Sequence, residues 1–267
     1  MNEPKAKKEV ATKSENIVAV SQPMDLATVM ADQGAGLSSH TMDDLAIPFI
    51  KILSSMSPQT KKNKTEYIEG ATEGMIFNTV SQELTDGTKG ISIVPCLFEP
   101  VLLEWTDRGQ GSSAPVVHPV ESDILNHAVK DAEGKLRLPS GTYLERTHNH
   151  YCLLIDNEGF TSQVLLSMKV SQLSKSRKWN TVIMGAKVRN GDIVINPPSW
   201  YYTYHLQTKA ESNDKGDWYG WNITRGEVVS ASVYTEAKAF HDSIKRKEVK
   251  VNYTEDDGTE KKDNNPF

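Results

Sequence analysis

Residues 200–208 read WYYTYHLQT, and residues 218–223 read WYGWNI. Aromatic and β-branched residues at this density favour β-strands. The segment between them contains Glu211-Ser212-Asn213-Asp214-Lys215-Gly216, which is rich in turn formers. This stretch therefore predicts a β-hairpin, and it suggests that the rest of the chain forms a sheet around it.

Further strands are predicted where apolar runs end at Gly, Pro, Asn or Asp. They cover residues 75–80, 91–105, 143–155, 163–168 and 228–233. Pro95 and Pro100 restrict the second of these to an edge or bulged strand. Helical spacing appears at residues 170–185, with Val170, Leu173, Trp179 and Ile183 inward, and again at residues 235–247. The sequence predicts a mainly antiparallel β domain with one or two helices.

Composition divides the chain into three parts. Residues 1–42 are rich in Lys, Glu, Ser, Ala and Gly, and we expect a mostly disordered arm in which residues 26–30 form at most a short helix. Residues 43–253 are expected to form the folded domain. Residues 254–267 are polar and acidic, and we expect them to be a disordered tail.

Several classes of protein are excluded by composition. Two cysteines among 267 residues are too few for a disulfide scaffold. No segment approaches the roughly 18 consecutive apolar residues of a membrane-spanning helix, and the N-terminus lacks the apolar core of a secretory signal. We therefore expect a soluble cytoplasmic protein that has no membrane contact.

The distribution of charge is more informative than the net charge of -5. Between Glu158 and Asp192 there are 33 residues without a single acid, although acids outnumber bases 35 to 30 in the whole chain. Phosphate groups are the natural partners of such a segment. The alternative is a basic helix face that meets only solvent. The six bases expected to contact phosphates are Lys169, Lys175, Arg177, Lys178, Lys187 and Arg189.

Aromatic residues are concentrated next to this segment: seven of the 20 lie within positions 200–221. Strand alternation puts Trp200, Tyr202 and Tyr204 on one face, and it separates Trp218 from Trp221 on the partner strand. One core cannot absorb rings on both faces, so some should be free to stack on bases, at about 1–3 kcal/mol each. The alternative is aromatic cross-strand pairing in a core, which we expect for some of the seven.

Two further segments combine cations with an aromatic ring. Ser176-Arg177-Lys178-Trp179-Asn180 places a ring between bases, so Trp179 is expected either to stack a base or to anchor a helix on the sheet. Residues 61–67 read KKNKTEY, in which Lys64 and Tyr67 form a weaker version of the same pattern.

The C-terminal tail ends in Pro266-Phe267 after a net charge of -3 over residues 254–267. An acidic segment can compete for a basic groove, and a terminal ring with its carboxylate can dock in a partner's apolar pocket. The tail residues expected to bind partner proteins are Asp256, Asp257, Asp263, Pro266 and Phe267.

The closing segment, residues 263–267, resembles the acidic Pro-Phe tip of bacterial single-stranded DNA-binding proteins, and phage proteins of this class likewise end in an acidic tail with a final Phe. In the body, residues 47–53, Glu104-Trp105 with Arg108 and Gly109, and residues 176–180 resemble a phage version. The resemblance implies an OB-type β-barrel with insertions. It also implies a protein that coats single-stranded DNA during phage replication and recombination, and that recruits replication, recombination or transcription proteins through its tail.

Catalytic and metal sites are weakly indicated. His148, His150 and Cys152 would share one face of a strand, but a zinc site normally needs a fourth ligand or a water. Glu104, Asp107 and Glu145, with Lys169, leave a metal-dependent nuclease as an alternative, and a phage structural or scaffolding protein is a third hypothesis. We expect no catalytic residue, no bound metal and no cofactor.

Overall fold

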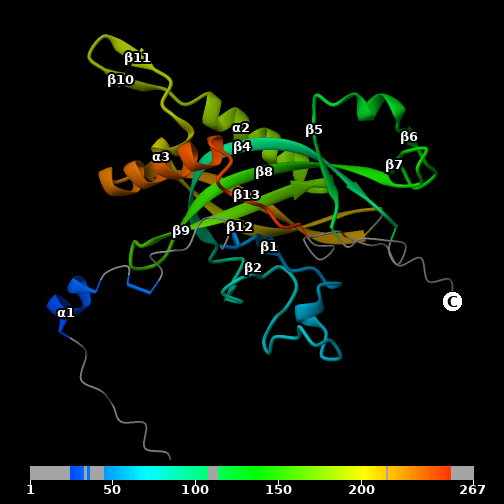
Figure 1. Ribbon diagram of the computed structural model, residues 1–267, viewed down its shortest axis with the longest axis horizontal. Coiled ribbons are helices and arrows are strands. Elements are labelled where there is room, and N and C mark those ends of the chain that lie inside the picture. The colour runs from blue at the N-terminus through cyan, green and yellow to red at the C-terminus, as the bar shows by residue number, and fades with distance from the viewer. Residues whose placement is uncertain (1–24, 33–34, 37–44, 108–113, 215, 254–267) are drawn as a thin grey trace, which may run out of the picture. The chain divides into compact units, whose positions relative to one another are not determined.

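Figure 1 shows the protein as a computed structural model, which describes residues 25–32, 35–36, 45–107, 114–214 and 216–253. The expected disorder of the N-terminal arm and of the tail falls largely or wholly on residues outside these ranges. The chain divides into two units, Met1–His40 and Thr41–Phe267. In the first unit the structure describes one helix, α1 (Leu26–Ala31), whose side chains are exposed.

Five long antiparallel strands form the body of the second unit. They are β4 (Ile91–Trp105), β8 (Tyr143–Ile155), β9 (Thr161–Lys169), β12 (Tyr202–Asn213) and β13 (Gly216–Val228). β4 pairs with both β8 and β12, while β9 pairs with β8 and β13 with β12. The β12–β13 pair is the hairpin expected from the aromatic stretch.

Helix α2 (Leu173–Met184) follows β9 and the short 3-10 turn η4 (Val170–Gln172), and it precedes β12. The order β4-β8-β9-α2-β12-β13, with these pairings, is that of an OB-type Greek-key barrel. A second helix, α3 (Ala231–Lys245), follows β13. The prediction of a mainly β, OB-type fold is confirmed.

The barrel is curled rather than fully closed by strands, because β13 ends the hydrogen-bonded order. The side-chain amide of Gln172 takes the place of a neighbouring strand. It donates from Nε2 to the carbonyl of Tyr219 at 3.1 Å and accepts from the backbone N–H of Trp221 at 3.2 Å. The segment after β9 is thereby joined to β13.

A small sheet completes the curl. It consists of β1 (Ile50–Ile52), β2 (Ile76–Asn78) and β3 (Leu84–Thr85). The 3-10 turn η2 (Pro58–Thr60) lies in the connection between β1 and β2. On one side Phe49 forms a parallel bridge to Leu165 of β9. On the other side the backbone N–H of Thr208 donates to Gly87 at 2.8 Å. A Cβ at Gly87 would lie 1.9 Å from the Thr208 hydroxyl oxygen, so this close approach requires glycine.

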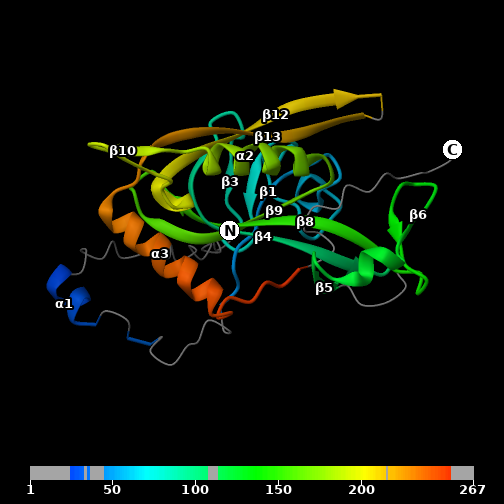
Figure 2. The same ribbon diagram turned by 90° about the horizontal axis from the view of Figure 1, so that it is seen from above.

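Two insertions extend from the barrel. One lies between β4 and β8 and the other between α2 and β12, and Figures 1 and 2 both place them at opposite ends of the unit. The first holds β5 (Val116–Pro119), the 3-10 turn η3 (Asp123–His127), β6 (Val129–Lys130) and β7 (Leu136–Arg137). The second holds β10 (Val188–Asn190), β11 (Ile193–Ile195) and the 3-10 turn η5 (Ser199–Tyr201).

Two hydrophobic cores use opposite faces of the central strands, because side chains alternate along each strand. The core inside the curl includes Ile93, Cys152, Val164, Leu166, Trp179, Tyr204, Leu206 and Trp221. The core on the outer face of β4, β8 and β9 includes Val94, Leu103, Tyr151, Leu153, Leu165, Ala237, Phe240 and Tyr253. Helix α3 therefore covers the outer face of these strands.

The structure corrects two expectations about where elements begin. Residues 228–233 were expected to be a strand, but α3 begins at Ala231, where the Ser230 hydroxyl caps the helix by accepting from the N–H of Val233 at 3.4 Å. Trp200 was expected in a strand, but it lies in η5. Pro197 and Pro198 precede it and supply no backbone N–H for a sheet, so β12 begins only at Tyr202.

Candidate nucleic-acid interface

Three of the aromatic residues expected to stack on bases are buried in the inner core. Trp179 is 2% exposed, Tyr204 1% and Trp221 5%. Trp179 reaches inward from α2 and stacks on His150, with ring centroids 4.4 Å apart. These rings pack where α2 covers the inner face of the sheet, so they are among the aromatic residues that the core absorbs. For Trp179, the alternative of a helix anchor describes its position.

The other hairpin aromatics are half-buried. Trp200 packs on α3, with its ring centroid 4.8 Å from that of His241, so it lies against the outer core and not on the face of Tyr202 and Tyr204 as expected. Tyr202 has the guanidinium carbon of Arg225 5.0 Å from its ring centroid. Trp218 donates from Nε1 to Glu211 at 3.0 Å.

The acid-free segment separates into paired and exposed cations. Lys169 is buried, and its Nζ lies 2.9 Å from Glu145 Oε2 on the outer face of the sheet. Lys175 forms an ion pair with Glu211. Both carboxylates come from strands outside the segment, which is why the sequence window did not contain them. The four exposed bases are Arg177, Lys178, Lys187 and Arg189.

Arg177 belongs to a surface that the sequence did not indicate. Phe98 of β4 is 38% exposed, and its ring centroid lies 5.1 Å from that of His148 on β8. Arg146 is exposed two residues before His148, on the same face of β8. Arg177 follows Ser176, whose hydroxyl lies 2.8 Å from His148 Nδ1. We call Phe98, Arg146, His148 and Arg177 the Phe98 patch.

The charge of the Phe98 patch is not neutralised nearby. Neither Arg146 nor Arg177 has a carboxylate within ion-pair distance among the residues that the structure describes. Burial, followed by the nearby charges of Arg146 and Arg177, lowers the pKa of His148, so the imidazole is neutral at pH 7. The patch therefore offers two cations beside one exposed ring.

A buried hydrogen-bond network supports the patch from below. The Ser176 hydroxyl lies 2.8 Å from both His148 Nδ1 and His150 Nε2. Burial lowers the pKa of His150 to about 3, so this ring is also neutral. These bonds fix α2 on β8, and with it the position of Arg177 relative to Arg146. The two histidines thus hydrogen-bond to a serine, and Cys152 is buried in the inner core.

Three of the expected ligand-binding residues meet at the edge of the hairpin. Lys175, Trp218 and Trp221 line a pocket of about 500 Å³ together with Lys209, Glu211 and Asn222. Glu211 accepts a hydrogen bond from Trp218 and pairs with Lys175 here, so this pocket is less positive than the sequence suggested.

The second basic segment lies elsewhere. Lys64 is exposed, and Tyr67 is half-buried in the lining of a pocket of about 520 Å³ beside β1 and β2. Figure 1 shows α2 above the central strands and β2 below them, although Trp179 of α2 and Ile76 of β2 both contribute to the inner core. Lys64 and Tyr67 are therefore not part of the surface around α2.

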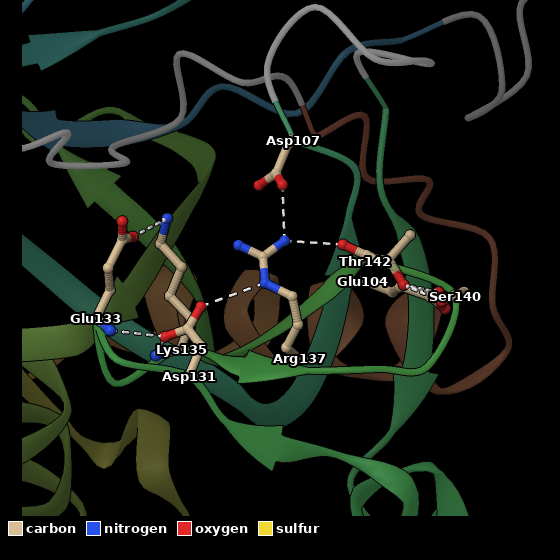
Figure 3. Close-up of polar contacts among 9 residues, drawn as sticks. Glu104, Asp107, Asp131, Glu133, Lys135, Arg137, Ser140 and Thr142 are labelled. Atoms are coloured by element: carbon tan, nitrogen blue, oxygen red, sulfur yellow. Dashed lines mark hydrogen bonds and ion pairs between the residues drawn. The ribbon is translucent and has the colours of Figure 1, made fainter.

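The carboxylates considered for a nuclease site have separate partners, as Figure 3 shows for the insertion. Arg137 Nη1 donates to Asp107 at 2.7 Å, and Arg137 Nε donates to Asp131 at 3.2 Å. Glu104 accepts from the Thr142 hydroxyl at 2.7 Å, which is the main reason its pKa is lowered. Glu145 is paired with Lys169 on the outer face. These three acids do not converge on a common point.

The tail residues Asp256, Asp257, Asp263, Pro266 and Phe267 lie outside the described part of the chain. The residue just before the tail, Tyr253, packs in the outer core. Tyr253 is buried, forms a hydrogen bond through its hydroxyl with Asn149 Nδ2, and has its ring centroid 5.9 Å from that of Phe49. The tail therefore starts from a fixed point on the outer face of the sheet.

The strand order and the helix between its third and fourth strands define an OB-type protein. The chain belongs to a bacteriophage family, that of the Pam3 phage gp34-like protein, whose model matches residues 13–250. No curated protein and no solved structure matches the chain. No helix in the described ranges is long and apolar enough to cross a membrane.

Proposed function

We propose that this phage protein binds single-stranded DNA. The observation that carries the proposal is the Phe98 patch: an exposed ring beside two cations without carboxylate partners, on an OB-type fold. Aromatic rings that stack on bases, with cations along the backbone, are how OB folds bind single strands without sequence preference. The family match to a phage protein is consistent with this role, and it names no ligand.

In this proposal the bound DNA follows a different path from the one common in simple OB folds. OB folds commonly bind oligonucleotides on the outer face of their second and third strands, which here are β8 and β9. In this protein that face packs against Ala237 and Phe240 of α3 and against Tyr253. We therefore propose that the single-stranded DNA runs on the opposite face, across the Phe98 patch and the exposed side of α2.

The exposed bases extend this surface. Arg177 and Lys178 lie on α2, and Lys187 and Arg189 lie in and beside β10. Each base that contacts a phosphate releases condensed counterions, so the log–log slope of affinity against salt is about -0.7 per contact. Together with Arg146, these bases give five such contacts, which predict a steep loss of affinity as salt rises. Stacking on Phe98 adds about 1–3 kcal/mol.

In this proposal the acidic tail, residues 254–267, regulates DNA binding. A net charge of -3 tethered to the domain competes with DNA for the exposed bases at roughly millimolar effective concentration. Phe267 serves as the docking residue for replication, recombination or transcription proteins. In the host cytoplasm, the protein would coat single strands and bring such partners to them.

The decisive experiment measures fluorescence anisotropy of a labelled oligothymidylate with the wild type and Phe98→Ala. We expect the variant to bind about 5- to 150-fold more weakly, which corresponds to about 1–3 kcal/mol. Phe160→Ala is the matched control, because Phe160 is 68% exposed in the β8–β9 turn and should leave affinity unchanged. Equal affinity of Phe98→Ala and the wild type would contradict the proposal.

The same titration distinguishes the other two hypotheses. Cleavage of the oligonucleotide on addition of Mg²⁺ would favour the nuclease, and no binding at any salt concentration would favour a structural or scaffolding protein. Deleting residues 254–267 should tighten DNA binding at low salt, whereas deleting Phe267 alone should leave it nearly unchanged. Equal affinity of the truncated and full-length proteins would rule out the tail as a competitor.

A further inference from the structure

The pocket beside β1 and β2 has the size and lining of a small-ligand site. Its volume is about 520 Å³, and it lies between the small sheet and the segment that contains η2 and the Lys61–Tyr67 loop. Its lining includes Phe49, Lys51, Gln59, Glu66, Tyr67, Phe77 and Val80. None of them belongs to the Phe98 patch.

The walls combine rings with one cation, Lys51, and one carboxylate, Glu66. Phe49, Tyr67 and Phe77 contribute aromatic surface, and Lys51 Nζ lies 5.7 Å from the centroid of the Phe77 ring. Phe49 and Phe77 are buried, so their positions are fixed by the neighbouring cores. A flat, apolar ligand carrying a negative group suits such walls, because the rings pack on its faces while the ammonium attracts its charge.

Gln59 supplies an unused polar group. Its side chain is 8% exposed, and its Oε1 is buried without a hydrogen-bond partner in the described structure. The residue is held in place because its carbonyl accepts from the backbone N–H of Ile68 at 3.0 Å. A buried acceptor without a donor costs free energy, which a ligand N–H in the pocket would recover.

The rim is basic. Lys61, Lys62 and Lys64 precede the lining residues Thr65 to Tyr67, and Lys62 and Lys64 are exposed. Backbone bonds from Lys64 N–H to the Lys61 carbonyl at 3.0 Å, and from Tyr67 N–H to the Lys64 carbonyl at 3.2 Å, form successive turns that lead from these lysines into the lining segment. Phosphate is the anion that such a cluster of ammonium groups favours.

We propose that this pocket binds one nucleotide whose base carries an exocyclic amino group. The base lies among Phe49, Tyr67 and Phe77, its amino group donates to Gln59 Oε1, and its phosphate meets Lys51 and the lysines that precede Thr65. A glutamine amide can pair with adenine through one donor and one acceptor, which favours adenine over thymine. The pocket shares no residue with the Phe98 patch, so the nucleotide site can be tested separately from the proposed function.

The test uses isothermal titration calorimetry with dAMP, dTMP and inorganic phosphate on the full chain. We expect dAMP to bind more tightly than dTMP, and phosphate alone to bind weakly. Lys51→Met, and Val80→Trp, which places a large ring in the lining, should each weaken dAMP binding by at least about tenfold. Val80 is 53% exposed, so the second variant blocks the pocket without disturbing a core.

Two comparisons keep the outcome clear. Lys89→Met removes an exposed cation outside the pocket and should bind dAMP like the wild type. If the nucleotide belongs to a strand, oligo-dA should bind more tightly than dAMP, and Val80→Trp should reduce that difference. If the ligand is a free nucleotide, Val80→Trp should affect dAMP alone. Absence of dAMP binding to the wild type, or unchanged binding in both pocket variants, would overturn the proposal.

Discussion

The two faces of the paired strands β4 and β8 have opposite roles, although successive residues of the same strands supply the side chains of both faces. On the face under α3, Leu103, Tyr151 and Leu153 are buried. The positive charge of Lys169 on this face is neutralised by its ion pair with Glu145. On the face toward α2, Phe98 and Arg146 are exposed, and the patch keeps its positive charge. A cation with a carboxylate partner stabilises the fold, whereas a cation without one is available to a ligand.

The largest effect is expected from Trp179→Ala. The ring is buried between His150 and Tyr204, so its loss should lower the free energy of unfolding by about 3–5 kcal/mol. Urea denaturation measures this change, with Phe98→Ala as the comparison, which should cost less than about 1 kcal/mol because its ring is partly exposed. Similar losses for both variants would show that Phe98 is a core residue and would remove the contrast between the rings.

Lys169→Met tests the contrast between cations. It leaves Glu145 half-buried without its partner, and breaking a buried pair in this way costs about 3 kcal/mol or more. The salt dependence of DNA binding should not change. Arg146→Met should do the reverse: stability is kept, and the log–log salt slope becomes less steep by about 0.7. A change of salt slope in Lys169→Met would mean that the outer face also meets DNA.

Acid should weaken the attachment of α2. The folded-state pKa values of His148 and His150 are lowered mainly by burial, the latter to about 3, while both groups titrate normally in the unfolded chain. The unfolded chain therefore binds more protons as pH falls below about 6.5, and stability falls from there toward pH 3. The slope is up to about 1.4 kcal/mol per pH unit for each histidine that stays neutral. Urea midpoints between about pH 7 and pH 5 measure it, and a flat profile would contradict the buried network.

The smallest effect concerns the two thiols. Burial raises the pKa of Cys96 to about 12 and that of Cys152 well above its usual range. Neither should react with iodoacetamide in the folded protein at neutral pH, and both should react in urea. Mass spectrometry of the alkylated protein provides the measurement. Rapid labelling of Cys152 without denaturant would show that the inner core opens readily.

The sequence predicted the strands better than the surface. The bounds of β4 and β8 agree with the predicted residues 91–105 and 143–155, because turn residues border both strands. Pro95 also indicated the bulge that is found between Pro95 and Leu97. That bulge shifts the alternation of side chains, and Phe98 consequently lies on the face toward α2. The Phe98 patch itself was missed because its residues come from two strands and a helix that only the fold brings together.

The carboxylate partners of Lys169 and Lys175 were missed for the same reason. Glu145 and Glu211 are distant in sequence, so a window of charges cannot reveal that they neutralise two of the six bases. Periodicity placed Trp179 on the inward face of its helix, but the expectation of base stacking depended on its neighbours in sequence. Burial of the ring follows from the way α2 packs on β8, which a single segment does not contain.

Gln172 covers part of an unpaired strand edge. β13 has no strand on its outer side within the hydrogen-bonded order, and such an unpaired edge is a template on which a second chain can add a strand. The amide of Gln172 occupies the carbonyl of Tyr219 and the N–H of Trp221, near the middle of that edge. Without this side chain both groups would be open to edge-to-edge pairing between molecules, the first step toward aggregation.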